Sequence, residues 1–168
     1  NTIRICGSAL ILIIALAVLI SYLTVRRRNV LNACIDTLSM VPYIIPGAVV
    51  GISLILAFNN PVLPLVGTAT IMIVSMCIRR IPYTIRSSVA ILAQIPLSID
   101  EAAESLGAGK VKTLLKVTLP MMFSGVFAGA VMSWVTLITE LSSSLLLYSF
   151  RTQTLNVAVY KAVGNGTD

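Results

Sequence analysis

Few residues in this sequence could carry chemistry, and Glu140 is the first of them. It is the only acidic residue inside an apolar run long enough to cross a membrane. An ionisable group at that depth is costly unless it faces water or a partner, so Glu140 is a candidate for the lining of a solute pathway. Pairing with a basic residue of another helix, or solvation near the outer membrane surface, is an equally valid interpretation.

The residues from Gly107 to Lys110 partly match a phosphate-binding loop. Glu104 stands where that loop needs its first glycine, and Val111 replaces the Ser or Thr that would hold magnesium. The sequence contains no histidine, and its three cysteines lack CxxC spacing, so a metal site is not expected either. We therefore expect no catalytic residue, cofactor or metal in this chain, and any ATP and magnesium would bind to a partner.

The composition is that of a membrane protein. Of the 168 residues, 57% are apolar and 11% are charged, and the mean hydropathy is +0.98. A helix that rises about 1.5 Å per residue needs about 20 apolar residues to cross a hydrocarbon core roughly 30 Å thick. The sequence thus predicts an all-α integral membrane bundle, with spans at about residues 5–25, 41–58, 65–85 and 119–147.

The basic residues lie in clusters between the apolar runs. They are not interleaved with aromatic residues on a polar surface, which argues against nucleic-acid binding. The positive-inside rule instead puts Arg26–Arg28 and Ser98–Lys116 in the cytoplasm, with Asn59–Pro64 and Thr152–Lys161 outside. The expected location is the inner membrane, crossed several times, with the lysines of Ser98–Lys116 facing solvent or the phosphates of membrane lipid.

Prolines and glycines punctuate the predicted spans. The residues from 29 to 41 have a helical apolar period and predict an amphipathic helix on the membrane surface. Pro82 should bend the third span near its end, where Arg79, Arg80 and Arg86 could reach water or line a polar gate. Two pairs of glycines have the four-residue spacing that allows close helix packing, namely Gly47 with Gly51 and Gly125 with Gly129.

The polar segment before the fourth span predicts two short helices. Ser98 followed by Glu101 forms a capping box, so the first helix should begin at Ile99 and stop at Gly107. Its apolar residues share one stripe, and its three acidic residues lie off that stripe. A second helix should follow and end at Pro120. Two short helices joined at a glycine would protrude from the membrane, where a partner protein could bind them.

The motif in this segment resembles the EAA loop of the permeases of ATP-binding-cassette (ABC) importers. It comprises Glu101-Ala102-Ala103, then Gly107, and then Val117-Thr118-Leu119-Pro120, where the family usually has Ile in place of Val117. In that family the loop contains a coupling helix that sits in a groove of the ATPase subunit, which implies the same role for Leu97–Leu106. The residues that the resemblance implies for ATPase coupling are Ser98, Glu101, Ala102, Ala103, Leu106, Gly107, Leu119 and Pro120.

The resemblance extends along essentially the whole chain. Three stretches are most like the second half of a ferric-iron permease, namely Pro42–Gly47, Arg79–Tyr83 and Glu140–Leu147. Permeases for polyamines (spermidine and putrescine), phosphonate and thiamine share much of this pattern and are alternatives. The resemblance implies the type I ABC importer fold, with residues 1–168 as one permease domain whose last span would follow beyond Asp168.

The resemblance also implies a set of partners. These are an ATPase dimer that hydrolyses ATP, a second permease domain and an extracytoplasmic solute-binding protein. The chain itself would then be a transport subunit and not an enzyme.

Two other classes of function stay open. One is a secondary carrier driven by protons or sodium, with Glu140 as the relay. The other is a membrane scaffold that transports nothing. Dependence of transport on a separate ATPase, and neighbouring genes for an ATPase and a solute-binding protein, would distinguish the importer from both.

Overall fold

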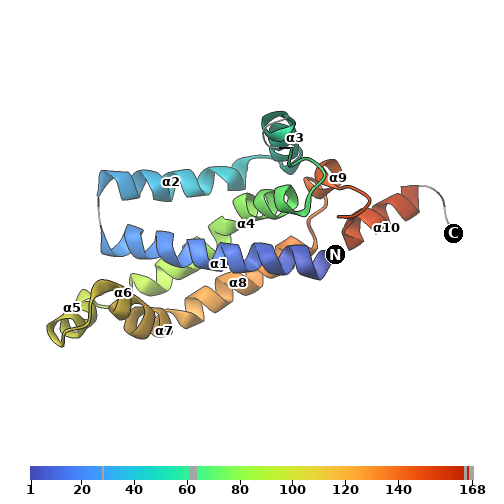
Figure 1. Ribbon diagram of the computed structural model, residues 1–168. Helices are drawn as coiled ribbons and strands as arrows, with labels where there is room; N and C mark the ends of the chain where they lie inside the picture. The colour runs from blue at the N-terminus through green and yellow to red at the C-terminus, as the bar shows by residue number, and fades with distance from the viewer. Residues whose placement is uncertain (28, 61–63, 165, 167–168) are drawn as a thin grey trace. The chain divides into compact units, whose positions relative to one another are not determined.

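The computed structural model describes residues 1–27, 29–60, 64–164 and 166. Within them the regular secondary structure is helical, apart from an isolated β-bridge between Asn59 and Pro64 (Figure 1). This confirms the all-α prediction. In chain order the elements are α1 (Thr2–Arg26), α2 (Val30–Ile44), α3 (Gly47–Phe58), α4 (Ala69–Leu92), α5 (Leu97–Ser105), α6 (Lys110–Thr113), the π-helical turn η1 (Leu114–Thr118), α7 (Leu119–Met121), α8 (Phe123–Ile138), α9 (Ser144–Leu147) and α10 (Leu155–Gly164).

The chain forms two compact units. The first unit comprises Asn1–Leu12, Val41–Arg80 and Trp134–Asp168, and the second comprises Ile13–Met40 and Ile81–Ser133. Helices α1, α4 and α8 therefore each contribute residues to both units. The predicted loop helices belong to the second unit, and Glu140 belongs to the first.

Helix α1 is a straightforward membrane-spanning candidate. Judged by length and apolar composition, it is the one helix among the described residues that could cross a membrane by itself. Two pairs of consecutive helices, α2 with α3 and the α6–α7 segment with α8, pass the same test only as sharply bent pairs. Up to three spans of this kind are therefore present in the part of the chain that the structure describes.

The predicted second span is not one helix. Helix α2 runs through Pro42 to Ile44, and α3 begins at Gly47 after a break at Pro46. Pro46 has an extended backbone, with φ −57° and ψ 140°, and a proline also disfavours the helical conformation for the residue before it. The expected surface helix and the start of the expected span are thus joined in α2.

The third and fourth predicted spans also differ from the observed helices. Helix α4 begins at Ala69 and continues through the buried Pro82 to Leu92, so the helix extends past residue 85, where the predicted span ended. A proline inside a helix forfeits one backbone hydrogen bond, a loss that neighbouring groups can make good in a membrane protein. The segment 119–147 is divided into α7, α8 and α9, with non-helical residues around Glu140.

Close packing of α8 against α4 organises the second unit. A Cβ atom built at Gly129 would lie only 2.7 Å from the Cα of Thr84, so a side chain there has no room. The Ser87 hydroxyl donates to the carbonyl of Gly125 at 2.6 Å, and the hydroxyls of Thr84 and Ser133 are 2.9 Å apart. The spacing of Gly125 and Gly129 thus serves helix contact, as predicted.

The opposite stripe of α8 is uncovered and apolar. Phe123, Phe127, Val131 and Val135 follow one another at four-residue intervals, and each is exposed. The rings of Phe123 and Phe127 stack with their centroids 5.8 Å apart. Such a stripe is typical of a helix that faces lipid or a partner helix.

Candidate functional site

Helix α5 begins differently from the sequence prediction. Its first residue is Leu97, its N-cap is Pro96, and no side chain caps it. The predicted capping box of Ser98 and Glu101 is therefore wrong, because a helix that starts after Pro96 leaves Ser98 inside the first turn. Both side chains are exposed instead.

The end of α5 confirms the role predicted for Gly107. Its φ is +84°, in the left-handed region that favours glycine. The amide of Ala108 donates to the carbonyl of Ala103 at 3.0 Å, and the amide of Gly107 donates to that of Glu104 at 2.9 Å. This pair of bonds is a Schellman motif, which ends the helix and turns the chain toward α6.

Replacing Gly107 should therefore loosen the loop. We expect Gly107→Ala to weaken its folded conformation by about 1 kcal/mol or more, from backbone strain alone, because a Cβ atom there meets nothing within 4 Å. Gly109→Ala is the matched control, since Gly109 has φ −68° and the same open surroundings. Hydrogen exchange of the α5 and α6 amides measures both, and equal protection in the two variants would contradict the prediction. Gly107→Val should also misplace α6 and weaken assembly with a partner.

The second loop helix does not stop at Pro120. A continuous helical path runs from Lys110 to Met121 and contains the π-helical turn Leu114–Thr118. Because proline lacks the amide that would bond four residues back, a wider turn immediately before Pro120 suits this sequence. The chain then bends at Met122 and enters α8.

The loop presents apolar side chains that nothing in the second unit covers. Leu106 is 90% exposed, and Leu97, Val111 and Leu115 are exposed as well. Ala102 is also exposed, and Ala103 is half-buried. Small and apolar residues uncovered on a short protruding helix are suited to contact with a partner protein.

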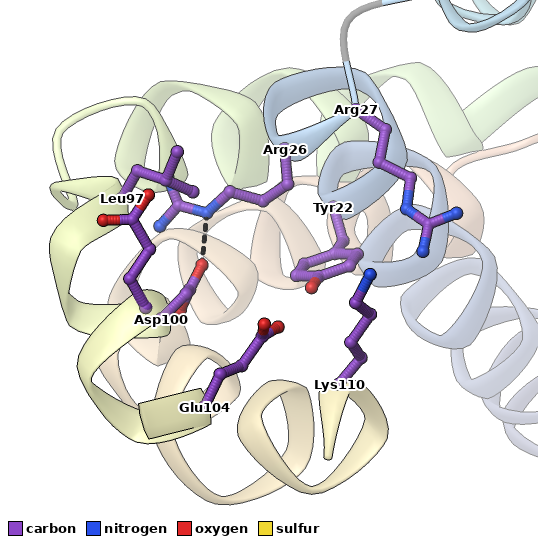
Figure 2. Close-up of a pocket in the computed structure, with 8 residues that line it drawn as sticks. Tyr22, Arg26, Arg27, Leu97, Asp100, Glu104 and Lys110 are labelled. Carbon is purple, nitrogen blue, oxygen red and sulfur yellow. Dashed lines mark ion pairs between the residues drawn. The ribbon is translucent and has the colours of Figure 1, made fainter. Parts of the chain in front are cut away.

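A buried acid in α5 was missed from the sequence. Asp100 lies 2.7 Å from Arg26 at the end of α1, measured from Oδ2 to Nε, and the two side chains are only 6% and 7% exposed. Thr118 of η1 donates its hydroxyl to Oδ1 of Asp100 at 2.8 Å. Figure 2 shows this ion pair at the edge of a cleft of about 210 Å³, into which Glu104 and Lys110 also point. The signal in the sequence was Arg26, the first charged residue after the uncharged run from Ile5 to Val25.

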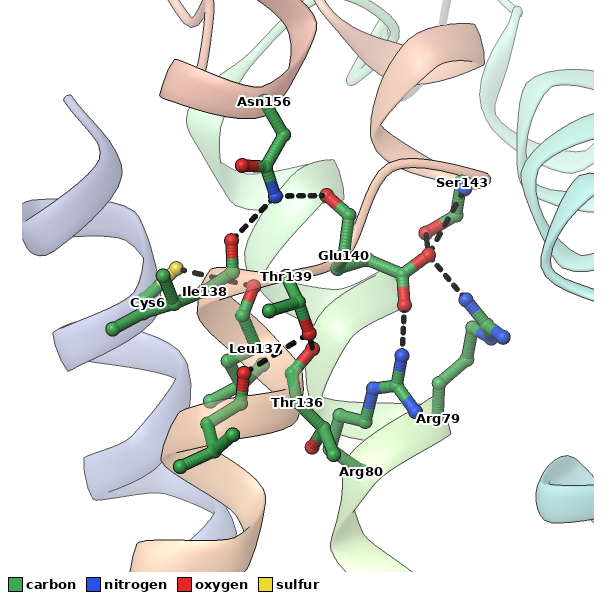
Figure 3. A network of polar contacts seen from close by, with 11 residues as sticks. Cys6, Arg79, Arg80, Thr136, Leu137, Ile138, Thr139, Glu140, Ser143 and Asn156 are labelled. Carbon is green, nitrogen blue, oxygen red and sulfur yellow. Dashed lines mark hydrogen bonds and ion pairs between the residues drawn. The ribbon is translucent and has the colours of Figure 1, made fainter.

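Glu140 is the centre of a buried ion cluster in the first unit. It is 3% exposed, and its two carboxylate oxygens pair with Arg79 and Arg80 of α4 (Figure 3). The amide of Ser143 donates to Oε1 of Glu140 at 3.2 Å, and the hydroxyl of Ser143 lies 3.3 Å from the same atom. Of the interpretations left open above, the structure therefore shows pairing with another helix.

The arginines of α4 lie away from the end of a helix, where the sequence predicted them. Arg79 and Arg80 lie near the middle of α4, away from either end, and they face Glu140. Arg86 pairs with Asp36 of α2 at 3.3 Å. The absence of a side chain at Gly47 leaves room for the Arg79 guanidinium, since a Cβ atom there would collide with it.

The polar backbone around Glu140 is satisfied by neighbouring side chains. The side-chain amide of Asn156 in α10 donates to the carbonyls of Ile138 and Glu140 at 2.5 and 3.5 Å. The Cys6 thiol lies 3.6 Å from the carbonyl of Leu137. The Asn156 contact thus provides a partner for the carbonyl of Ile138, the last residue of α8, whereas the Leu137 carbonyl also accepts from the amide of Glu140 at 3.2 Å. Among the described residues no three His, Cys, Asp or Glu side chains are grouped so that they could hold a metal ion.

The known proteins to which this chain is similar are components of transport systems. Residues 7–161 match the family described as the binding-protein-dependent transport system inner membrane component. A protein of Haemophilus influenzae, provisionally named as a ferric transport system permease, is 34% identical over 98% of this chain and 26% of its own length. The ferric transport system permease protein of Actinobacillus pleuropneumoniae is 31% identical over 99% of this chain and 24% of its own length.

A more distant relative is the molybdate/tungstate transport system permease protein of Pyrococcus abyssi, which is 29% identical over 83% of this chain and 53% of its own length. The chain thus spans about a quarter of the length of the two ferric relatives. The family match covers the loop motif, the arginines of α4 and Glu140 together. This chain belongs to the family of inner membrane components of binding-protein-dependent transport systems.

Proposed function

We propose that this chain is a permease domain of an ABC importer that forms part of a gated solute pathway and performs no covalent chemistry. A separate ATPase, with its own ATP and magnesium, would drive the transport cycle. The observation that carries the proposal is helix α5, closed by Gly107 and uncovered at Leu106, within the sequence that matches the family.

Helix α5 is the proposed coupling helix. The small side chains of Ala102 and Ala103 allow close approach by a groove, and Leu97 and Leu106 supply exposed apolar anchors. The exposed carboxylate of Glu101 would meet a basic group of the ATPase and orient the helix. Of the remaining predicted residues, Ser98 is available for contact, whereas Leu119 and Pro120 act within the helix that follows the loop.

The proposed partners are an ATPase dimer, a second permease domain and an extracytoplasmic solute-binding protein. The family description names the binding protein. A second permease domain in the same polypeptide is supported by the ferric relatives, which are about four times as long as this chain.

Ferric iron is the proposed substrate, because two relatives matched along nearly the whole chain carry ferric transport in their names. Molybdate or tungstate is a second candidate, favoured by the Pyrococcus abyssi relative. Polyamines, phosphonate and thiamine stay as weaker alternatives. Glu140, together with Arg79 and Arg80, is proposed to lie beside the solute pathway.

The proposed topology is several passes through the inner membrane, with α5 in the cytoplasm. In a variant without Cys6, Cys34 and Cys77, a reagent that cannot cross membranes should label Asn60→Cys in intact cells and leave Ser105→Cys unlabelled. Permeabilised cells provide the control, since Ser105→Cys is exposed and should then react. Labelling of Ser105→Cys from outside would overturn the proposal. Arg28 and residues 61–63, which the topology also assigns, lie outside the described residues.

Reconstitution tests the function itself. The full-length parent protein, its ATPase and its solute-binding protein are placed in proteoliposomes, and uptake of ferric iron and of molybdate is measured. ATP-dependent iron uptake that resists a protonophore is expected. Uptake driven by a proton or sodium gradient would indicate a secondary carrier. No uptake of iron, molybdate, polyamines, phosphonate or thiamine would favour a scaffold.

A further inference from the structure

We infer that the Arg26–Asp100 ion pair is a positioning device that fixes the angle of α5 against the end of α1, so that movement of α5 is passed to α1. The inference rests on the proposed function, because it takes α5 as the coupling helix. Neither residue contacts solute or nucleotide in this account. Both are positioning residues.

Arg26 contacts one residue before the start of α5 and one residue in its first turn. Its Nη1 donates to the carbonyl of Ile95 at 3.0 Å, immediately before Pro96, and its Nε lies 2.7 Å from Oδ2 of Asp100 in the first turn. One guanidinium therefore holds the chain before the helix and the helix itself. Rotation of α5 about Pro96 would separate Arg26 from at least one of these partners.

Asp100 also connects α5 to the returning helix. Its Oδ1 accepts the hydrogen bond from Thr118, which ends the π-helical turn η1. The other acids of α5, Glu101 and Glu104, are exposed, whereas Asp100 is buried. The carboxylate thus joins α5 to α1 through one oxygen and to η1 through the other.

Burial makes this contact hard to replace. The two charged side chains are more than nine-tenths buried, beside an apolar cluster that includes Leu92, Ile95 and Met122. A buried charge left without its partner is strongly unfavourable, whereas a well-formed pair specifies one geometry. Apolar packing alone would tolerate small sliding of α5 against α1. The ion pair makes the two helices move together.

The test uses the full-length parent in complex with its ATPase and solute-binding protein. The readout is the amount of solute transported per ATP hydrolysed, measured beside the amount of assembled complex. Asp100→Asn and Arg26→Gln should each lower this ratio about tenfold, as expected for loss of one partner of a buried pair. The double variant Arg26→Asp with Asp100→Arg should recover part of it. Arg27→Gln, an exposed neighbour of the same charge, is the matched control and should leave the ratio unchanged.

A milder variant keeps the inference testable if Asp100→Asn fails to assemble. Thr118→Val hardly changes the volume of the side chain but removes the hydroxyl that donates to Asp100. It should lower the amount of solute transported per ATP about two- to threefold. An unchanged ratio in Thr118→Val, Asp100→Asn and Arg26→Gln, with any loss of uptake explained by less complex, would overturn the inference. The ion pair would then be only structural.

Failure of the inference is distinguishable from failure of the proposed function. Ala103→Trp, at a half-buried position of α5, enlarges the proposed docking surface and leaves both residues of the ion pair unchanged. If Ala103→Trp abolishes coupling and Asp100→Asn leaves the ratio unchanged, α5 is still the coupling helix and the inference alone is wrong. If Ala103→Trp has no effect on uptake or association, the proposed function of α5 is itself contradicted, and the inference falls with it.

Discussion

Glu140→Gln should destabilise the first unit by about 3–5 kcal/mol, because it removes the carboxylate charge that Arg79 and Arg80 share in a buried cluster. The side chains of Arg79 and Arg80 are only 15% and 17% exposed, so water can compensate little. We expect a lower Tm in detergent and less protein in the membrane. Solute uptake should fall at least in proportion to the loss of protein from the membrane.

The control is Glu104→Gln, which neutralises an exposed carboxylate and should change stability by no more than about 0.5 kcal/mol. Replacing Arg79 and Arg80 together with Glu140 by glutamine should recover much of the lost stability, since no charge is then left unpaired. If Glu140→Gln instead keeps its Tm and loses uptake only, Glu140 acts in the solute pathway and structural pairing is not its main role.

Gly129→Ala should be the next most damaging change. Its Cβ atom would lie 2.7 Å from the backbone of Thr84 and 3.0 Å from Cβ of Ser87, and a backbone atom cannot move aside without shifting α4. Overpacking of this kind costs about 1–3 kcal/mol. We expect this loss in the thermal unfolding of purified protein.

The same substitution at Gly7 is the matched control. Gly7 lies inside α1, and a Cβ atom there meets nothing within 4 Å. Gly7→Ala should be neutral or stabilising by about 0.5–1 kcal/mol, because alanine favours the helix. Equal Tm values for the two variants would show that α8 and α4 are not in tight contact at Gly129.

The helical class and the loop could be predicted from the sequence because they depend on local patterns. Long apolar runs indicate helices in a membrane, and Gly107 supplies a conformation that other residues adopt only with strain. The breaks could not be placed in the same way. Hydropathy continues through Pro42, Pro46 and Glu140, and only the observed backbone distinguishes a proline that a helix tolerates from one that ends it.

The burial of Asp100 escaped prediction for a different reason. Helical periodicity put Asp100 off the apolar stripe of α5, and that position is ordinarily solvated. It is buried because Arg26, distant in the sequence, neutralises it there. Pairing of Glu140 with a basic residue of another helix was one interpretation that the sequence left open, but the identity of its partners, Arg79 and Arg80, follows from tertiary contact and from no local spacing.

The capping box failed through competition between two start signals. Ser98 and Glu101 have the required spacing, but Pro96 comes first and fixes the chain so that the helix begins at Leu97. Glu101 is consequently left exposed at the surface of α5. That exposure strengthens the proposal that Glu101 contacts a partner.

Two variants of the full-length parent test most directly whether α5 couples this permease to an ATPase. Ala103→Trp and Glu101→Lys should insert normally, yet lose ATP-dependent solute uptake, with reduced co-purification of the ATPase or with hydrolysis that no longer drives transport. Ala15→Trp, the same enlargement at an exposed site of α1, should retain both activities. Normal uptake and normal ATPase association in both Ala103→Trp and Glu101→Lys would contradict the proposal that α5 is the coupling helix.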